Sequence, residues 1–249
     1  MSGLRVLALV ACLMATMAVP ATPAAIFTPP ALAPGTQYRI VFITSTSHDA
    51  QSTLIADYNT FVNNAANAGG SILQPLMATW SVIGSTDAVS AITNIGGASS
   101  LPMYLLDGTF VASGTTDLFD GSIAAAINID ELGNTSAGGD VYTGSNADGT
   151  IDSFGHALGS IMNMHSEIGN VGSLTSGVFL HQTNRAFNLT RPFYGISSTL
   201  TVPAAPPAGV PEPGTITMMV AGAFLMMGAK RYQRHATRAN PGTTETRHR

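Results

Sequence analysis

The sequence predicts an α+β, β-rich domain between two terminal segments of different character. Three observations lead to this prediction: short β-branched and aromatic runs bounded by turn residues, one run with helical spacing of apolar residues, and a C-terminal region that is first proline-rich, then apolar, then basic. The chain has 249 residues, of which only 10% are charged. This length allows one globular domain once the terminal segments are set aside.

Four runs have the composition of β-strands, at residues 38–44 (YRIVFIT), 79–83 (TWSVI), 101–106 (LPMYLL) and 194–202. In the last run Tyr194, Ile196, Leu200 and Val202 share one face, with Ser198 as a small gap. The domain therefore begins and ends with strands, and we expect these two strands to pair.

One amphipathic helix follows the first strand, because apolar residues recur at three- and four-residue spacing from Leu54 to Ala65. Thr46 and Ser47 are the expected N-terminal caps, and Gly69-Gly70 ends the run. A second, brief helix is expected through Ile92, capped by residues 85–87.

The middle of the domain contains a weak repeat of the form Asp-Gly-hydroxyl-apolar, at residues 107–110, 120–123 and 148–151. Asp-Gly favours tight turns because glycine accepts positive φ, so three turns or hairpin corners are expected. Calcium-binding loops are the alternative, since carboxylate and backbone oxygens suit a hard cation. Asn146, Asp148 and Asp152 are the weak candidate ligands, and apart from this calcium no cofactor is expected.

The first 25 residues have the organisation of an export signal. Arg5 supplies a positive charge, residues 6–19 are apolar, and small residues among prolines follow at 20–25. This order predicts a signal peptide that signal peptidase cleaves between residues 21 and 25. A buried helix or an uncleaved anchor is the alternative, but the apolar run is short for a membrane span.

The C-terminal region has three consecutive parts: a proline-rich spacer (203–213), an uncharged apolar run of 14 residues (216–229), and a basic cluster that begins with Lys230, Arg231 and Arg234. At ~1.5 Å per helical residue the apolar run reaches about 21 Å, short of the roughly 30 Å hydrocarbon core, so a marginal single span is expected. The basic cluster holds its C-terminal side in the cytoplasm and leaves the domain outside.

The triplet Pro211-Glu212-Pro213 lies just before this apolar run. The order of triplet, short apolar helix and basic tail resembles the PEP-CTERM signal of exosortase substrates. The resemblance implies that an exosortase recognises Pro211, Glu212 and Pro213 and cleaves near them, so the three are substrate residues and not catalytic ones. A plain single-span anchor with a proline-rich stalk is the alternative.

The predicted organisation is a signal peptide (1–25), a proline-rich linker (26–36), a globular α+β domain (37–203), a spacer with the Pro-Glu-Pro motif (204–214), a hydrophobic sorting helix (215–230) and a basic cytoplasmic tail (231–249). Residues 36–203 hold three arginines, twelve acids and no lysine, a net charge of −9 that excludes nucleic acid as a partner. The sole cysteine, Cys12, lies in the signal peptide, so the mature domain has no disulfide or thiolate chemistry.

The domain also resembles domains that PEP-CTERM proteins carry, in segments such as YRIVFITSTSHDA (38–50), MYLLDGTFVA (103–112) and VYTGSNADGT (141–150). A first strand, a helix, a loop-rich Asp-Gly segment and a closing strand are similar to the C-type-lectin and endostatin-like architecture. The resemblance implies that fold, although its usual disulfides are missing and Trp80 is the only tryptophan. It implies no settled biochemical activity.

The residues point to no catalytic constellation. The histidines of the domain are His48, His156, His165 and His181, and no two of them have the i, i+4 spacing of a helical metal site. His165-Ser166-Glu167 matches the His-x-Glu of zinc deaminases, but their Cys-x-x-Cys is absent.

A serine elbow and a lysine base are also absent from the domain. Carboxylate pairs such as Asp117 with Asp120, or Asp130 with Glu131, are expected to be solvated surface groups.

We therefore expect a non-enzymatic protein of the cell envelope or extracellular matrix. It is exported, held transiently in the inner membrane, and sorted by exosortase to the surface or matrix of a Gram-negative-type bacterium. Its loops are expected to bind exopolysaccharide or calcium. The alternative is a secreted hydrolase that uses Asp or Glu residues on matrix polysaccharide.

Overall fold

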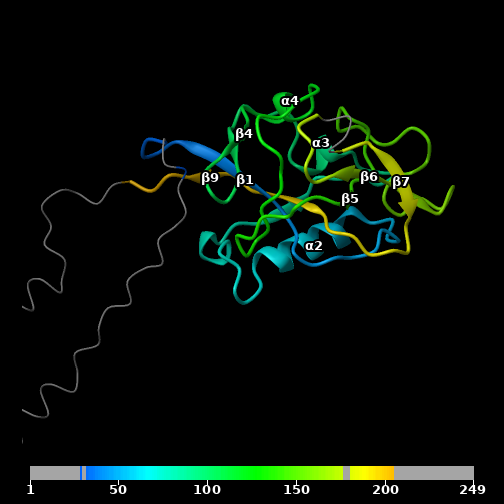
Figure 1. Cartoon of the computed structure of the whole chain (residues 1–249). Coiled ribbons are helices and arrows are strands. Elements are labelled where there is room, and N and C mark those ends of the chain that lie inside the picture. Colours follow the sequence, from blue (N-terminus) through cyan, green and yellow to red (C-terminus); the bar gives the residue numbers. More distant parts are fainter. Residues whose placement is uncertain (1–28, 30–31, 176–179, 205–249) are drawn as a thin grey trace, which may run out of the picture. The chain divides into compact units, whose positions relative to one another are not determined.

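The computed structural model describes residues 29, 32–175 and 180–204, which lie within the compact unit Ala24–Ala205. It has two β-sheets and short helices around them, so the predicted β-rich α+β class is confirmed (Figure 1). Within the described residues, no helix has the length and apolar character needed to span a membrane. The predicted signal peptide, the Pro211-Glu212-Pro213 motif, the apolar run and the basic residues Lys230, Arg231 and Arg234 lie outside the described residues.

The elements in chain order are β1 (Gln37–Ile43), α2 (Ile55–Ala66), the short 3-10 helix η1 (Gln74–Leu76), β2 (Trp80–Val82), α3 (Ala91–Asn94), β3 (Met103–Tyr104), β4 (Phe110–Ala112), α4 (Thr115–Leu118), β5 (Asp140–Tyr142), β6 (His165–Asn170), β7 (Thr183–Ala186), β8 (Tyr194–Ser197) and β9 (Leu200–Thr201). The larger sheet has the order β2-β8-β1-β3-β4, with β9 also paired to β1, and the smaller sheet has the order β5-β6-β7. β1 and β3 run parallel, whereas the strands of the smaller sheet are antiparallel.

β1 is the central strand of the larger sheet, as its apolar composition predicts. Residues 38–43 are all buried, which requires cover on both faces. β1 pairs with β8 through Val41 and Ile196 and with β9 through Tyr38 and Leu200. The expected pairing of first and last strands is thus confirmed, although the last run divides into two strands where Ser198 donates its N–H to the Thr79 carbonyl.

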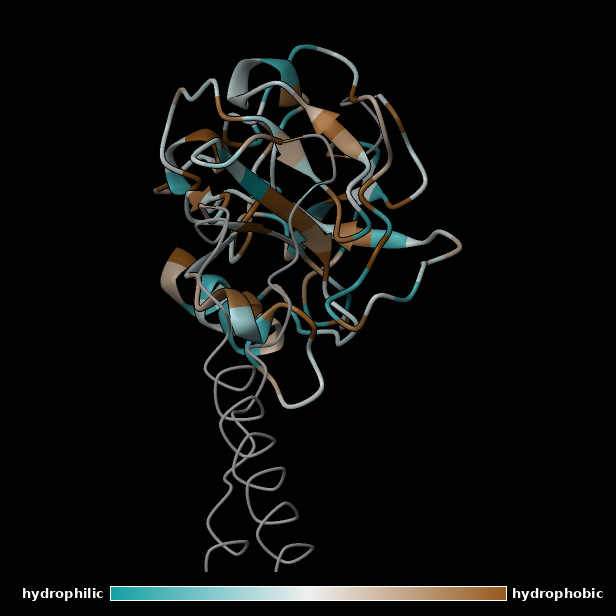
Figure 2. Cartoon of the chain, turned by 90° about the vertical axis from the view of Figure 1, so that its left-hand side faces the viewer, coloured by the Kyte–Doolittle hydropathy of each residue, from teal (hydrophilic) through white to brown (hydrophobic). Residues whose placement is uncertain are grey.

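α2 packs against β2 and β8 and buries Tyr58, Val62 and Ala66. Gly195 on β8 allows this close approach, because a Cβ there would lie 2.3 Å from the Phe42 ring and 2.6 Å from Val62. Figure 2 shows hydrophobic residues on strands in the middle of the domain, while the helix below carries both hydrophobic and hydrophilic residues. The helix therefore covers the sheet with one apolar face.

The hydrophilic face of α2 also stabilises the edge strand of the larger sheet. Asn63 Oδ1 accepts the N–H of Trp80 at 3.2 Å, and Asn59 Oδ1 accepts the N–H of Val82 at 2.8 Å. Asn94 donates to the Val82 carbonyl at 2.8 Å. These side chains take the place of a neighbouring strand, so β2 presents fewer free backbone groups at its edge.

The predicted start of the first helix was wrong. Thr46 and Ser47 do not cap it: α2 begins at Ile55, after Leu54, which is 62% exposed instead of part of the buried face. The reason is a long-range pairing, because His48 and Arg191 exchange both backbone hydrogen bonds. This pairing keeps the segment after β1 extended.

The predicted cap of the second helix was also displaced. α3 begins at Ala91, and its N-cap is Ser90, whose hydroxyl accepts the N–H of Thr93. Ser85 has a different role, since its Oγ accepts the N–H of Ala91 at 2.8 Å from outside the helix. Both residues satisfy N–H groups at the start of α3, which have no partner within the helix.

The two sheets meet at Phe193, one residue before β8. Tyr142 at the end of β5 forms a bridge with Phe193, and Thr44 just after β1 donates its N–H to the Phe193 carbonyl at 2.9 Å. The Phe193 ring packs against Tyr58 of α2 at 5.3 Å between ring centroids. This junction positions the smaller sheet, which carries the site described next.

Candidate functional site

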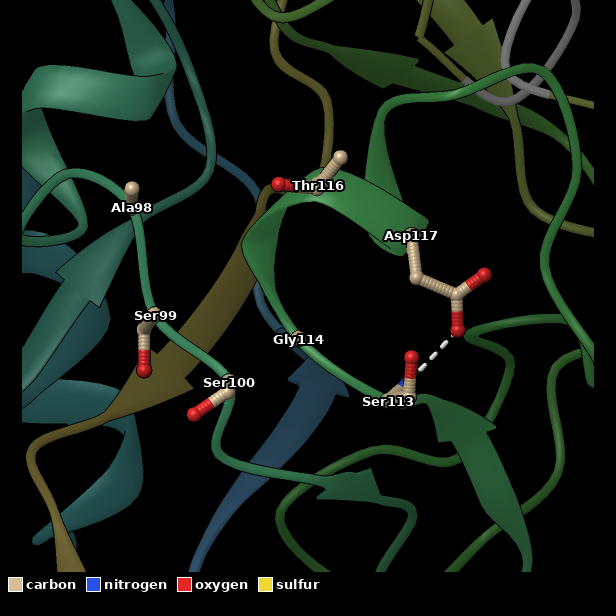
Figure 3. Close-up of a pocket in the computed structure, with 7 residues that line it drawn as sticks. All are labelled: Ala98, Ser99, Ser100, Ser113, Gly114, Thr116 and Asp117. Carbon is tan, nitrogen blue, oxygen red and sulfur yellow. Dashed lines mark hydrogen bonds between the residues drawn. The ribbon is translucent and has the colours of Figure 1, made fainter.

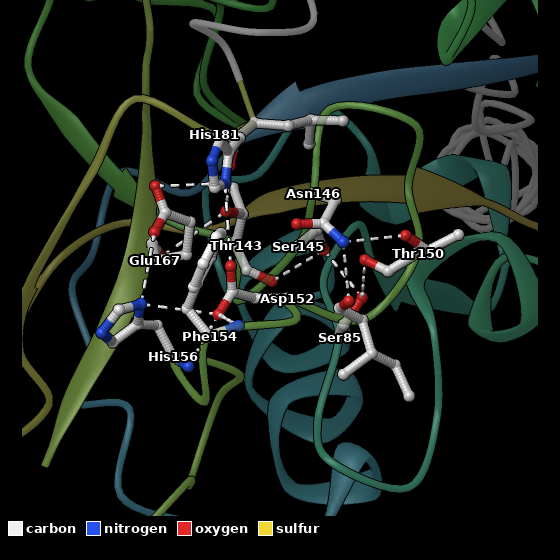
Figure 4. A network of polar contacts seen from close by, with 12 residues as sticks. Ser85, Thr143, Ser145, Asn146, Thr150, Asp152, Phe154, His156, Glu167 and His181 are labelled. Carbon is white, nitrogen blue, oxygen red and sulfur yellow. Dashed lines mark hydrogen bonds and ion pairs between the residues drawn. The ribbon is translucent and has the colours of Figure 1, made fainter. Parts of the chain in front are cut away.

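Four titratable side chains meet beside the smaller sheet: Asp152, His156, Glu167 and His181 (Figure 4). Asp152 and His156 belong to the loop between β5 and β6, Glu167 is the third residue of β6, and His181 lies two residues before β7. We call these four residues the carboxylate–histidine cluster.

The loop places Asp152 through an Asx turn. Its Oδ2 accepts the backbone N–H of Phe154 at 2.9 Å and that of His156 at 2.8 Å. These two hydrogen bonds hold the side chain in one orientation and bring His156 to the same place. The other carboxylate oxygen, Oδ1, then points toward His181, 3.9 Å from its Nδ1.

Strand pairing places Glu167. Its backbone N–H donates to the His156 carbonyl at 2.7 Å, and its own carbonyl accepts the N–H groups of Thr143 and Gly144 at 3.0 and 3.1 Å. The Thr143 hydroxyl in turn donates to the carbonyl of Leu180, the residue before His181. The hydrogen bonds of Glu167 and Thr143 therefore bring the three chain segments of the cluster together.

Gly144 permits the close contact between these segments. Its φ is +61°, a left-handed conformation that side chains disfavour, and a Cβ there would lie 2.4 Å from both the Leu158 nitrogen and the Ser85 carbonyl oxygen. Its carbonyl accepts the N–H of Asp152. We infer that any side chain at this position would displace the start of the Asp152 loop.

The cluster contains buried atoms that lack a hydrogen bond. Among the described residues, none forms a hydrogen bond with Asp152 Oδ1, Glu167 Oε1 or His181 Nδ1. These three atoms belong to residues whose ligand atoms all lie within 4.8 Å of one another. The Asp152 and Glu167 side chains are 0% and 3% exposed, so solvent does not reach them freely. A buried carboxylate oxygen without a hydrogen bond is unfavourable.

The pKa of the Glu167 carboxyl reflects the cost of this burial. Burial, and secondly the charge of Asp152, raise the pKa of the Glu167 carboxyl to about 8. In the cation-free protein Glu167 therefore holds its proton at neutral pH. A cation between the two groups would counteract that shift, because its positive charge favours the ionised carboxylate.

The histidines form the more exposed side of the cluster. The His156 and His181 side chains are 19% and 35% exposed. His156 Nδ1 lies 3.4 Å from Asp152 Oδ2 and 4.0 Å from Glu167 Oε2, and His181 Nδ1 lies 3.4 Å from Glu167 Oε1. Both rings thus direct Nδ1 toward the carboxylates, and three of the four residues, Asp152, Glu167 and His181, have ligand atoms close enough together to hold a metal ion.

Of the three weak calcium candidates, only Asp152 belongs to this cluster. Asn146 donates its amide to Thr150 Oγ1 and to the Ile151 carbonyl, on the opposite side of the view in Figure 4. Asp148 Oδ1 accepts both the N–H and the hydroxyl of Thr150, which lower the pKa of its carboxyl. These two side chains serve the turn and do not converge with Asp152 on one point.

The Asp-Gly repeat corresponds to three turns, as expected. Asp107, Asp120 and Asp148 each accept the N–H of the hydroxyl residue two positions later, at 2.9, 3.4 and 3.0 Å. The glycine after each has positive φ. The repeat is therefore a recurring Asx turn.

The other residues considered for catalysis lie apart. His48 is held by its bridge to Arg191, and His165 is exposed at the start of β6. Asp117 accepts the N–H of Ser113, and Asp120 closes its own turn. Glu131 was expected on the surface, but it is buried. Its carboxylate is satisfied there, because it accepts the N–H and the hydroxyl of Ser45.

A separate pocket of about 370 Å³ is lined by residues 98–100, 113, 114, 116 and 117 (Figure 3). Hydroxyl side chains dominate its lining: Ser99, Ser100, Ser113 and Thr116. Its single carboxylate, Asp117, already accepts the Ser113 N–H at 2.6 Å. The pocket can accept polar groups, but it contains no pair of converging charged side chains.

Neither a protein-family model nor a curated protein matches this chain. Sequence reasoning missed Glu167 and His181 as members of one cluster, since 14 positions separate them. The available signal was the four-residue spacing of Asp152 and His156, together with the His-x-Glu triplet in which Glu167, and not His165, is the buried member.

Proposed function

We propose that this protein is a non-enzymatic component of the cell envelope or extracellular matrix whose exported domain binds a divalent cation at the carboxylate–histidine cluster. The observation that carries the proposal is the pair of buried oxygens, Asp152 Oδ1 and Glu167 Oε1, that lack hydrogen bonds and face His181. A divalent cation supplies the positive charge that this pair needs.

The cation has a structural consequence for the domain. Asp152 and His156 lie in the loop after β5, whereas Glu167 and His181 belong to β6 and to the segment before β7. A bound ion would cross-link these three segments. Binding to the folded state alone raises the free energy of unfolding, by about 2.7 kcal/mol at a cation concentration of ~100 Kd.

Thermal unfolding of the full-length protein tests this part of the proposal. We expect EDTA to lower the melting temperature and a divalent cation to restore it. Asp152→Asn should remove the response, while Asp148→Asn, four positions away in a neighbouring turn, should retain it. Equal responses of the two variants would contradict a cation at the cluster.

We also propose that the chain is exported by an N-terminal signal peptide and sorted by an exosortase. The support is the order of Pro211-Glu212-Pro213, apolar run and basic residues Lys230, Arg231 and Arg234. Signal peptidase and exosortase are its processing partners, and exopolysaccharide is the partner expected at the cell surface. Intact mass from cells with and without exosortase tests this: loss of the segment after Pro213 should require the enzyme, and an unchanged tail in both would favour a simple anchor.

The domain itself we assign to the C-type-lectin and endostatin-like architecture. The pairing of β1 with β8 and β9, the helix α2 after β1, and the loop-rich middle support this assignment. An experimental structure in which β1 and β8 were not neighbours would contradict it.

A second candidate is acid–base hydrolysis of matrix polysaccharide. It is favoured by one observation, the raised pKa of Glu167 beside Asp152, since such pairs can supply a general acid and a carboxylate. The burial of both side chains argues for the binding role, because a polymer has no direct contact with them. Turnover of a glycan panel that disappears in Glu167→Gln would favour the hydrolase.

A further inference from the structure

We propose that the carboxylate–histidine cluster selects a zinc-class first-row transition metal over calcium. This inference rests on the proposed cation-binding function and names the chemical class of the cation. It follows from three features of the cluster: the donor types, the burial of the carboxylates, and the way in which Asp152 is held.

The donor types include nitrogen as well as oxygen. His181 Nδ1 is one of the three ligand atoms within 4.8 Å, and His156 Nδ1 lies 3.4 Å from Asp152 Oδ2. Imidazole suits zinc, copper, iron and nickel, whereas calcium takes six to eight oxygen ligands. Asp152, Glu167 and His181 thus supply two carboxylates and one imidazole, which match the three protein ligands of a zinc site with a fourth, open position.

The burial of the carboxylates limits the contribution of water. Calcium would need several oxygens beyond those of Asp152 and Glu167, and magnesium keeps several of its waters. The side chains are 0% and 3% exposed, and solvent approaches from the histidine side, where His181 is 35% exposed. A four-coordinate ion fits these conditions, with at most one position open to solvent.

The hydrogen bonds around Asp152 resemble the support of a metal ligand. Oδ2 accepts two backbone N–H groups, while Oδ1 is buried without a hydrogen bond among the described residues. One oxygen is thus fixed by the protein and the other remains for an ion. Such outer contacts orient ligands and contribute 10–100-fold to metal affinity in typical sites.

The test uses the untagged full-length protein, treated with EDTA and exchanged into metal-free buffer. It is titrated with Co²⁺ while visible absorption is recorded, then with Zn²⁺ as competitor, and Ca²⁺ binding is measured separately by calorimetry. We expect one Co²⁺ per chain with the strong visible bands of a four-coordinate ion, displacement by Zn²⁺, and no displacement by millimolar Ca²⁺.

Two variants and one control localise the ion. His181→Ala and Asp152→Asn should each weaken Co²⁺ binding at least ~100-fold. His165→Ala, at an exposed histidine on β6, should leave it unchanged. His181 is partly exposed, so its variant should fold, and Asn keeps an acceptor for the two N–H groups at position 152. Circular dichroism verifies folding of both.

The outcomes separate this inference from the proposed function. Ca²⁺ binding that Asp152→Asn abolishes and His181→Ala retains, without Co²⁺ bands, would overturn the transition-metal inference and leave a divalent-cation centre. Cation binding that neither variant affects, or no cation binding at all, would overturn both.

Discussion

Glu131 and Glu167 are two buried glutamates of the same domain, and they differ in how their oxygens are satisfied. Their exposed fractions are 3% and 2%. Glu131, beside the larger sheet, accepts the N–H and the hydroxyl of Ser45. Glu167, in the smaller sheet, has one oxygen without a hydrogen bond among the described residues and a second carboxylate nearby. Burial alone therefore does not distinguish a candidate site; a buried carboxyl oxygen without a hydrogen bond, beside a second carboxyl group, does.

The difference arises from the partners that the fold brings to each carboxyl group. Ser45 lies two residues after β1, and the bridge between Ile43 and Asp130 brings it next to Glu131. This pairing supplies two donors to one carboxylate. The nearest side chains to Glu167 are Asp152, which is an acceptor, and two histidines. The first arrangement stabilises the fold without a ligand, while the second needs a proton or a cation.

The largest expected effect is that of Glu167→Gln on cation affinity. The substitution removes a charged ligand, so affinity should fall at least ~100-fold in a Co²⁺ titration. The free energy of unfolding of the cation-free protein should rise by at least about 2 kcal/mol at pH 8, because a buried charge beside Asp152 is lost. Glu131→Gln is the matched control and should leave affinity unchanged. Normal cation affinity in Glu167→Gln would contradict the assignment of Glu167 as a cation ligand.

Glu131→Ala should lower the stability of the domain and leave its cation affinity unchanged. It leaves the N–H and hydroxyl of Ser45 without an acceptor, so the free energy of unfolding should fall by about 3 kcal/mol in denaturant titrations. Cation affinity should remain that of the natural protein. A loss below ~0.5 kcal/mol would show that water replaces the carboxylate and that Glu131 is not structural.

The pH dependence of the free energy of unfolding, measured without a cation, is a further test of the difference between Glu131 and Glu167. Glu167 has a pKa of about 8 in the folded state, above its ordinary value near 4.5, so the folded state holds the proton more tightly. The contribution of protonated Glu167 to the free energy of unfolding is fully present below pH 4.5 and is lost as pH rises toward 8. From this group we expect a loss of about 2 kcal/mol between pH 5 and pH 7.

Denaturant titrations at several pH values in EDTA measure this loss. Glu167→Gln should lack this part of the pH dependence, and a saturating cation should suppress it in the natural protein, because the ion favours the ionised carboxylate. A stability curve that is identical in Glu167→Gln and in the natural protein would contradict the assignment.

The smallest expected effect concerns Asp148, the turn carboxylate four positions before Asp152. Asp148→Ala removes two hydrogen bonds to Thr150 on the protein surface, so the free energy of unfolding should fall by about 1 kcal/mol or less. Asp107→Ala, in the equivalent turn, should behave alike, and neither should alter cation affinity. A loss of cation affinity in Asp148→Ala that Asp107→Ala does not show would place the cation in the loop of residues 146–152 instead.

Sequence periodicity predicted the strands and helix that depend on local pattern. The apolar run of β1, the helical spacing of α2 and the Asp-Gly turns are each confirmed within one or a few residues, apart from the start of α2. Adjacent residues dictate these elements. That start, at Ile55, depends on the pairing of His48 with Arg191, 143 positions apart, which no local pattern contains.

The smaller sheet shows the limit of sequence reasoning most clearly. β6 (HSEIGN) and β7 (TNRA) lack the apolar alternation of a typical strand, and the sequence did not predict them. They form because each supplies backbone partners to the other. This pairing, together with the hydrogen bonds of Glu167 and Thr143, brings Glu167 and His181 to Asp152.

By itself, the sequence determined a β-rich α+β domain with local turns, an acidic composition and no cysteine outside the first 25 residues, because these are properties of neighbouring residues and of composition. The tertiary structure decided which carboxylates are satisfied. Glu131 and Glu167 are the same residue type, and their difference arises from partners that the fold brings from distant positions.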